Sequence, residues 1–208
     1  MSLVSIAHHF LDRLTVPEFE RLRAIATGLS GMTVPVGSTC SGLATTGLCV
    51  KALFQAINQR FNTNCQASCE FAVENSPPKQ RFILGAHGDE IKHLFADVSC
   101  FEKDEAFCLK EGKSVKIPTV FLLVASPSCV NLSGQRSDRA EFASCYQDDS
   151  SASASGHTYQ FGYRKATQRT EAEVTIYENV RDAAHSLKDS DGKTCTPAVD
   201  IIRDETRS

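Results

Sequence analysis

The chain has 208 residues, a formal charge of −3 at pH 7 and a pI of about 6.1. A chain of this length fits one globular domain and buries a substantial core without metal or disulfide staples. The mild acidity excludes the strong basic excess of proteins held to nucleic acid by phosphate contacts alone. Any nucleic-acid contact must therefore come from a local patch or from a part that this sequence lacks.

The nine cysteines are an odd number and lie scattered along the chain. Such a pattern is typical of a reducing compartment rather than of a disulfide framework. The N-terminus lacks the basic segment and apolar run of a secretory signal, and nowhere do 18 apolar residues follow one another. We therefore expect a soluble intracellular protein with no membrane segment.

The first 33 residues form a predicted helical lead-in, and residues 34–208 a single domain. Apolar residues recur at helical spacing over residues 5–30, and Pro17 opens a second helical piece. A glycine-containing break then precedes the first β-rich run.

Short β-rich runs alternate with helical segments through the rest of the chain. The longest apolar run, residues 119–125, is typical of a central strand covered by helices on both faces. Because parallel neighbours need crossover connections, the alternation predicts an α/β fold with a doubly wound, mostly parallel sheet. The predicted strands are residues 34–40, 69–73, 93–96, 119–125 and 172–177, and the predicted helices are residues 47–57, 77–84 and 197–204.

Polar residues stand at the ends of the first three predicted strands, where nucleotide-binding sheets hold their ligands. Ser41 and Gly42 make a small-residue turn that lets the backbone approach a ligand, although an ordinary tight turn is the simpler interpretation. Glu74 lies where such folds place an acid that hydrogen-bonds ribose hydroxyls. Asp97 can accept a hydrogen bond from an adenine amino group, and a solvated or helix-capping acid is the alternative for both carboxylates.

Two further residues suit nucleophilic and acid–base chemistry. Cys129 follows a buried strand and a Ser-Pro-Ser turn, so we expect it to be partly exposed near backbone N–H groups that favour the thiolate. Most free cysteines are buried hydrophobes, and the other eight fit that description. Glu178 ends the last strand, where an apolar environment lets a carboxyl group hold or share a proton, although a helix-capping role is equally compatible.

Five short motifs follow one another in the chain: CSGLATTG, VEN, ADV, SPSCVNLS and YENV. Their succession over about residues 34 to 205 resembles the consecutive motifs of cytosine-5 DNA methyltransferases. The resemblance implies a Rossmann-like methyltransferase fold that uses S-adenosyl-L-methionine to methylate carbon 5 of cytosine in DNA, in the nucleus if the organism is eukaryotic. Cys129 would attack carbon 6 of the base, and Glu178 would hydrogen-bond or protonate the ring at N3.

The resemblance also assigns binding residues and implies no metal site. The cofactor residues follow the first three predicted strands: Ser41, Gly42 and Leu43 for the methionine portion, Glu74 and Asn75 for the ribose, and Asp97 and Val98 for the adenine. Because the target carbon is inaccessible inside a duplex, the base would be flipped into the pocket. Residues 130–156 would close over the DNA through Ser133, Arg136 and Arg139. Independently of the resemblance, the small polar residues 147–157 predict an exposed mobile loop inside the domain.

The chain departs from the family pattern in three places. Ser128 stands where a second proline is usual, Cys40 where a phenylalanine is common, and Thr45 where a glycine is usual. The family also continues past the YENV motif with an arginine-rich strand, a target-recognition region and a segment that completes the fold. We therefore expect a truncated catalytic domain, or one completed by a partner protein.

Three alternatives to a DNA methyltransferase remain open. The same catalytic residues serve an RNA cytosine-5 methyltransferase. A module without catalytic activity would keep the fold and the cofactor and regulate a partner enzyme. An unrelated α/β protein would match by chance. Covalent trapping of Cys129 by a 5-fluorocytosine substrate distinguishes the enzymes from the module.

Overall fold

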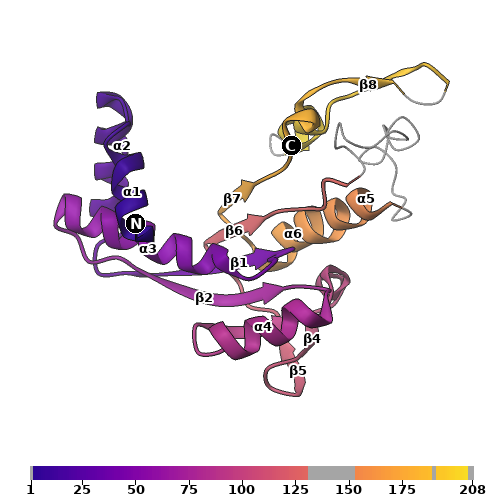
Figure 1. The fold of residues 1–208 in the computed structure, drawn as a ribbon, viewed down its shortest axis with the longest axis horizontal. Helices are drawn as coiled ribbons and strands as arrows, with labels where there is room; N and C mark the ends of the chain where they lie inside the picture. Colours follow the sequence, from indigo (N-terminus) through magenta and orange to yellow (C-terminus); the bar gives the residue numbers. More distant parts are fainter. Residues whose placement is uncertain (1, 131–152, 189–190, 206–208) are drawn as a thin grey trace.

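The computed structural model describes residues 2–130, 153–188 and 191–205. A sheet of seven strands in the order β5-β4-β3-β2-β1-β6-β7 forms its centre (Figure 1). Five neighbouring strands of this sheet are parallel, and they are β1 (Thr33–Thr39), β2 (Gln66–Val73), β3 (Ile91–Phe95), β6 (Leu122–Ala125) and β7 (Val174–Tyr177).

The order of the strands confirms the predicted doubly wound, mostly parallel sheet. The chain moves outward from β1 through β2 to β3, crossing by α3 (Thr45–Phe61) and α4 (Pro77–His87), and then returns to the other side of β1 for β6 and β7. The connections therefore diverge from the junction of β1 and β6. Ligands bind at such a junction in open α/β sheets, beyond the carboxyl ends of the strands.

The predicted strands agree with the structure to within three residues at either end, and the largest shifts are at the starts of β2 and β6. Residues 119–121 were expected to belong to β6, but it begins at Leu122. The backbone N–H of Val120 donates to Thr170 O and that of Phe121 to Pro35 O, so both groups are satisfied before the strand begins. The strand was expected to be central, but β6 lies between β1 and the edge strand β7, one position from the edge of the sheet.

An antiparallel hairpin, which the sequence did not predict, extends the sheet beyond β3. It consists of β4 (Glu105–Cys108) and β5 (Lys113–Lys116), and Gly112 makes its turn at a φ of 67°. Each strand has four residues. Glu105, Lys113 and Lys116 are charged and exposed, and the short apolar run of residues 106–109 cannot be told from part of a helix by its pattern alone.

Helices cover both faces of the sheet, and a bulge in β2 decides which side chains face which helices. Cys69 pairs with Val36 and Phe71 with Gly37, so the intervening Glu70 is an extra residue that reverses the alternation. Cys69 packs with α3 and α4, whereas Phe71 packs on the opposite face with the 3-10 helix η1 (Val98–Glu102).

Gly37 is the position in the sheet where added volume has the clearest cost. A Cβ atom at residue 37 would lie 2.3 Å from the ring of Phe71, which is 2% exposed and cannot move away. We expect Gly37→Ala to lower the free energy of unfolding by about 1–3 kcal/mol, measured by urea denaturation. Gly85→Ala is the control, because Gly85 lies in α4 with open space around it and alanine favours the helix. Equal stability of the two variants would contradict the prediction.

The expectation of an exposed loop over residues 147–157 is wrong for residues 153–157. Ser153 is buried and caps α5 (Ala154–Tyr159), where its hydroxyl accepts from the Gly156 N–H. The helix continues through the π-helical turn η3 (Gln160–Lys165) into α6 (Ala166–Thr170). Serine, alanine and glycine also favour exposed loops, so composition alone did not reveal this helix.

The predicted lead-in consists of two helices that pack on α3. They are α1 (Leu3–Leu11) and α2 (Val16–Gly28), and Leu11 and Ala26 share a buried cluster with Ile57 of α3 (Figure 1). A domain boundary at residue 34 stays a prediction. None of the helices described in the structure has the length and apolar character needed to span a membrane.

The segment after β7 adds short elements and a second, two-stranded sheet. They are the 3-10 helix η4 (Arg181–Ala184), β8 (Leu187–Lys188), β9 (Thr194–Cys195) and α7 (Ala198–Glu205), which agrees with the last predicted helix.

Candidate functional site

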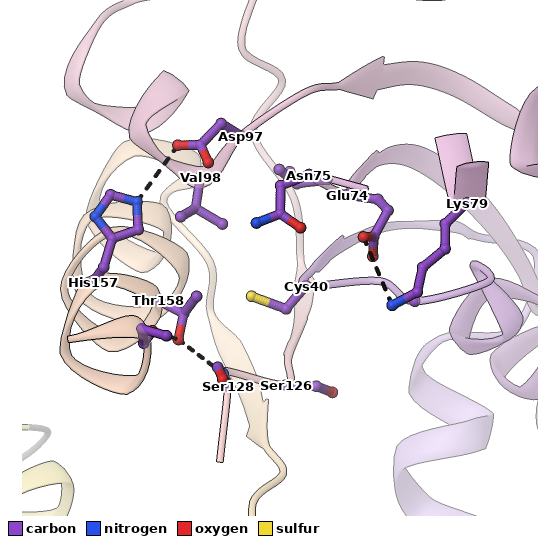
Figure 2. Close-up of a pocket in the computed structure, with 13 residues that line it drawn as sticks. Cys40, Glu74, Asn75, Lys79, Asp97, Val98, Ser126, Ser128, His157 and Thr158 are labelled. Atoms are coloured by element: carbon purple, nitrogen blue, oxygen red, sulfur yellow. Dashed lines mark hydrogen bonds and ion pairs between the residues drawn. The ribbon is translucent and has the colours of Figure 1, made fainter. Parts of the chain in front are cut away.

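A cavity of about 370 Å³ opens at the carboxyl ends of β1, β2 and β3. Figure 2 shows Glu74 and Asp97 on opposite sides of it, with Asn75 and the Cys40 thiol between them. Five of the seven residues assigned to the cofactor line this cavity, namely Gly42, Glu74, Asn75, Asp97 and Val98. The other described residues that line it are Cys40, Val73, Lys79, Ser126, Ser128, Ala154, His157 and Thr158.

The turn between β1 and α3 has an unusual backbone. Cys40, Gly42 and Ala44 adopt positive φ angles of 53°, 59° and 57°. For residues other than glycine this conformation costs about 1–3 kcal/mol and is concentrated at functional sites. The turn brings both Cys40 and Gly42 to the wall of the cavity.

Two residues assigned to the methionine portion lie elsewhere in this turn. Ser41 is buried, and its hydroxyl accepts a hydrogen bond from the Val73 N–H at 3.1 Å and bonds to Ser38 Oγ at 2.7 Å, so it joins β1 to β2. Leu43 is 44% exposed. Neither is among the described residues that line the cavity.

Glu74 is a buried carboxylate whose two oxygens have different surroundings. It is 5% exposed, and its Oε1 atom accepts from the Ser76 N–H at 2.9 Å and lies 3.9 Å from Lys79 Nζ. The described residues donate no hydrogen bond to Oε2. Because Glu74 lines the cavity, Oε2 can accept a hydrogen bond from a ligand or from water there.

Asp97 caps η1 and lies beside His157 of α5 (Figure 2). Its Oδ1 atom accepts from the Ser99 N–H at 2.8 Å and lies 3.5 Å from His157 Nε2. Burial by itself raises the pKa of Asp97, but the hydrogen bonds from Ser99 and the proximity of His157 outweigh it, so the pKa lies below its ordinary value. Asp97 is therefore an anionic hydrogen-bond acceptor at neutral pH.

The lowered pKa of Asp97 links stability to pH. The contribution is present above the unfolded-state pKa of about 3.9 and is lost as pH falls through the lower folded-state pKa. We expect Asp97→Ala to lower the free energy of unfolding by about 1 kcal/mol at pH 7, as for loss of a helix cap, and by less as the pH drops below about 4. Urea denaturation at pH 7 and below about pH 4 measures the two free energies of unfolding. The control Asp89→Ala, in the exposed turn after α4, should show neither effect. A stability difference between the wild type and Asp97→Ala that grows as the pH falls would contradict the prediction.

Cys40 points into the cavity but is a poor nucleophile. Burial, together with the carboxylates of Glu74 and Asp97, raises the pKa of its thiol to about 12. The wall beside it is tight, because a Cβ atom on Gly162 would lie 3.5 Å from Cys40 Sγ and 3.1 Å from Val98. Cys40 therefore shapes the pocket as a neutral thiol.

The two predicted catalytic residues follow neighbouring strands. Cys129 comes after β6 and is partly buried, which confirms the expected partial exposure. Glu178 comes directly after β7, and its N–H donates to Ala125 O. The side chain of Asn179 donates to Pro127 O at 3.3 Å, so the YENV motif contacts the loop that carries Cys129.

Neither catalytic residue lines the described cavity wall. Glu178 is also exposed, so the apolar surroundings expected of its carboxyl group are not found. Ser133, Arg136 and Arg139, which were expected to contact nucleic acid, lie outside the described residues.

Sequence reasoning missed several side chains that complete the cavity wall. His157 and Thr158 come from α5, and Thr158 Oγ1 accepts from the Ser128 N–H at 2.8 Å. Lys79 belongs to the first turn of α4, and its position directly after Pro77-Pro78 was the only signal in the sequence. His157 and Thr158 could not be found without the helix that brings them to this edge.

Among known proteins, only solved structures match this chain. No protein-family model matches the sequence, and no curated protein matches it. One solved structure that matches is that of a proposed RNA methyltransferase from Pyrococcus horikoshii, with a TM-score of 0.38 and 11% sequence identity, over 87% of this chain and 74% of that chain. A likeness this distant assigns neither a substrate nor a reaction to the chain.

Proposed function

We propose that this chain binds S-adenosyl-L-methionine in the cavity and belongs to a methyltransferase. The observation that supports the proposal is the placement of Glu74 and Asp97 at the ends of neighbouring strands, facing one cavity. Glu74 Oε2 is available to the ribose hydroxyls, and Asp97 to the adenine amino group. The cavity volume falls within the range of about 300–1,000 Å³ typical of small-molecule pockets.

The charge of the cavity fits this cofactor. Glu74 and Asp97 both lie in the wall, and Lys79 is its only lysine or arginine among the described residues. A sulfonium cofactor brings a positive charge toward these carboxylates, which they stabilise. The bound cofactor would supply an electrophilic methyl group.

The reaction that we propose is methylation of carbon 5 of cytosine in DNA. The Cys129 thiolate would add to carbon 6, and Glu178 would hydrogen-bond or protonate N3, so that carbon 5 becomes nucleophilic. After methyl transfer, loss of the carbon 5 proton and expulsion of the thiolate restore the ring. Contact between Asn179 and the Cys129 loop supports a shared role for the two motifs. An RNA substrate would use the same residues.

A regulatory module without catalytic activity is the second candidate. Glu178 is exposed, and neither it nor Cys129 is in the described wall of the cavity. These observations favour a protein that binds the cofactor and acts on a partner enzyme. Retained cofactor binding without a covalent adduct would select this candidate.

Calorimetric titration of the purified chain with S-adenosylhomocysteine tests the cofactor site. We expect micromolar affinity with one ligand per chain, and weaker binding of adenosine, which lacks the amino-acid portion. No heat of binding by a chain shown to be folded by circular dichroism would overturn the proposal.

A further inference from the structure

Three metal-ligating side chains meet at the junction of β3 with the hairpin, outside the lining of the cavity. His93 lies in β3, Cys108 ends β4, and Glu111 lies in the turn before β5. The imidazole, thiol and carboxylate ligand atoms all lie within 4.8 Å of one another. Cys108 is fully buried, whereas the side chains of His93 and Glu111 are 22% and 28% exposed. The cluster therefore has a buried sulfur and an open side.

The spacing of these atoms suits a small divalent cation. Zinc binds sulfur at about 2.3 Å and nitrogen or oxygen at about 2.0–2.2 Å, so neighbouring ligands of a tetrahedral site lie about 3.3–3.6 Å apart. His93 Nδ1 and Glu111 Oε1 are 2.6 Å apart, and no pair exceeds 4.8 Å. The ligand-atom distances in the structure lie on both sides of those in a tetrahedral zinc site. Small rotations of the side chains would bring the atoms to the zinc-site distances.

A second observation points to a ligand at this place. His93 Nδ1 is buried, and its close polar contact among the described residues is with Glu111 Oε1 at 2.6 Å, without a hydrogen bond of good geometry. A metal ion between the two atoms would give the buried nitrogen a well-oriented partner. Lys113 Nζ lies 3.0 Å from Oε2 of Glu111, so Oε1 is the oxygen left facing the histidine.

We propose that His93, Cys108 and Glu111 bind a zinc ion. Thiolate and imidazole ligands select zinc over magnesium or calcium, which take oxygen ligands. Three protein ligands leave a fourth position, and the exposed side of the cluster gives water access to it. Binding displaces the proton of the Cys108 thiol, so the thiolate, carboxylate and neutral imidazole together carry two negative charges against the two positive charges of the ion.

The position of the cluster indicates what the ion does. The β3–β4 ladder is short: Phe95 pairs with Cys108, and the Leu109 N–H donates to Leu94 O at 2.8 Å. A metal held by β3, by the end of β4 and by the hairpin turn would fasten the hairpin to the parallel sheet. The proposal does not depend on the proposed function, because these residues are separate from the cofactor cavity.

Cobalt(II) tests the site directly, because its bond to a thiolate gives a charge-transfer absorption in the near ultraviolet. The full chain is stripped with a chelator and titrated with Co²⁺, and then Zn²⁺ is added. We expect the band to saturate at one equivalent of Co²⁺ and to disappear as Zn²⁺ displaces it. Zinc should also raise the melting temperature. Absence of the band in the folded chain overturns the proposal.

Variants assign the site to these residues. We expect Cys108→Ser to lose the band, and His93→Gln and Glu111→Gln to weaken zinc binding by at least about 10–100-fold, the loss known for outer-shell partners. The latter two changes fall at partly exposed positions, so they keep the test valid if Cys108→Ser does not fold. The exposed Cys49 is the control, and Cys49→Ser should bind as the wild type does. Loss of the band in Cys49→Ser, or its retention in all three ligand variants, contradicts the assignment.

Discussion

Cys129→Ala is expected to abolish both methyl transfer and the covalent adduct with DNA that contains 5-fluorocytosine. The fluorine at carbon 5 cannot leave as a proton does, so an enzyme that has added its thiolate to carbon 6 stays bound to the base. Without the sulfur no bond to carbon 6 forms, and we expect turnover to fall by more than about 10³-fold. The adduct is measured as a shifted band on a denaturing gel, and turnover with radiolabelled S-adenosylmethionine.

Cys49→Ala provides the matched control for the nucleophile. Cys49 is exposed on α3, so its loss should leave adduct formation and turnover unchanged. Because Cys129 is absent from the described wall of the cavity, Cys129→Ala should also bind S-adenosylhomocysteine as the wild type does. An adduct that persists in Cys129→Ala would rule out this cysteine. RNA replaces DNA in a parallel assay to decide between the two substrates.

Glu74→Gln is expected to weaken binding of S-adenosylhomocysteine by about 10–100-fold. A hydrogen bond to a charged group contributes about 1.5–3 kcal/mol, and each 1.4 kcal/mol changes affinity about tenfold. Glutamine keeps an oxygen to accept from the Ser76 N–H, so the turn after β2 is preserved while the second acceptor becomes a donor. Calorimetric titration at pH 7 measures the change.

Glu70→Gln is the control for this substitution because it lies on the same strand. Glu70 forms an ion pair with Lys92 at 2.8 Å and is not among the described residues that line the cavity. The affinity of the Glu70→Gln variant for S-adenosylhomocysteine should match that of the wild type. Equal binding by Glu74→Gln and the wild type would show that the ribose is not held by this carboxylate, and the cavity would then need another ligand.

The cofactor and catalytic proposals rest on different parts of the site and fail separately. Glu74 and Asp97 follow β2 and β3, whereas Cys129 and Glu178 follow β6 and β7, on the other side of β1. Cofactor binding without a Cys129 adduct supports the regulatory module. Loss of both in a folded chain removes the methyltransferase proposal and leaves the zinc site to be tested by itself.

The sequence by itself determined the alternation of strands and helices and the doubly wound sheet. Apolar runs such as residues 69–73 and the turn residues that follow them carry this information locally. They also placed Glu74 and Asp97 at strand ends, which meet at one edge of any parallel sheet. These predictions depend on short-range patterns, and so they could be made without coordinates.

Only the tertiary structure decided which side chains share the cavity and which do not. Ser41 and Gly42 belong to the same small-residue turn, but the Ser41 hydroxyl accepts a hydrogen bond from β2, and Ser41 is not among the described residues that line the cavity. His157 reaches Asp97 from a helix whose small residues resembled a loop, and Glu178 remains exposed beside an edge strand. Likewise, His93 and Cys108 come together only because a hairpin, whose four-residue strands are too short to show a periodic pattern, folds back onto β3. Contacts between residues distant in sequence depend on packing, which no local pattern records.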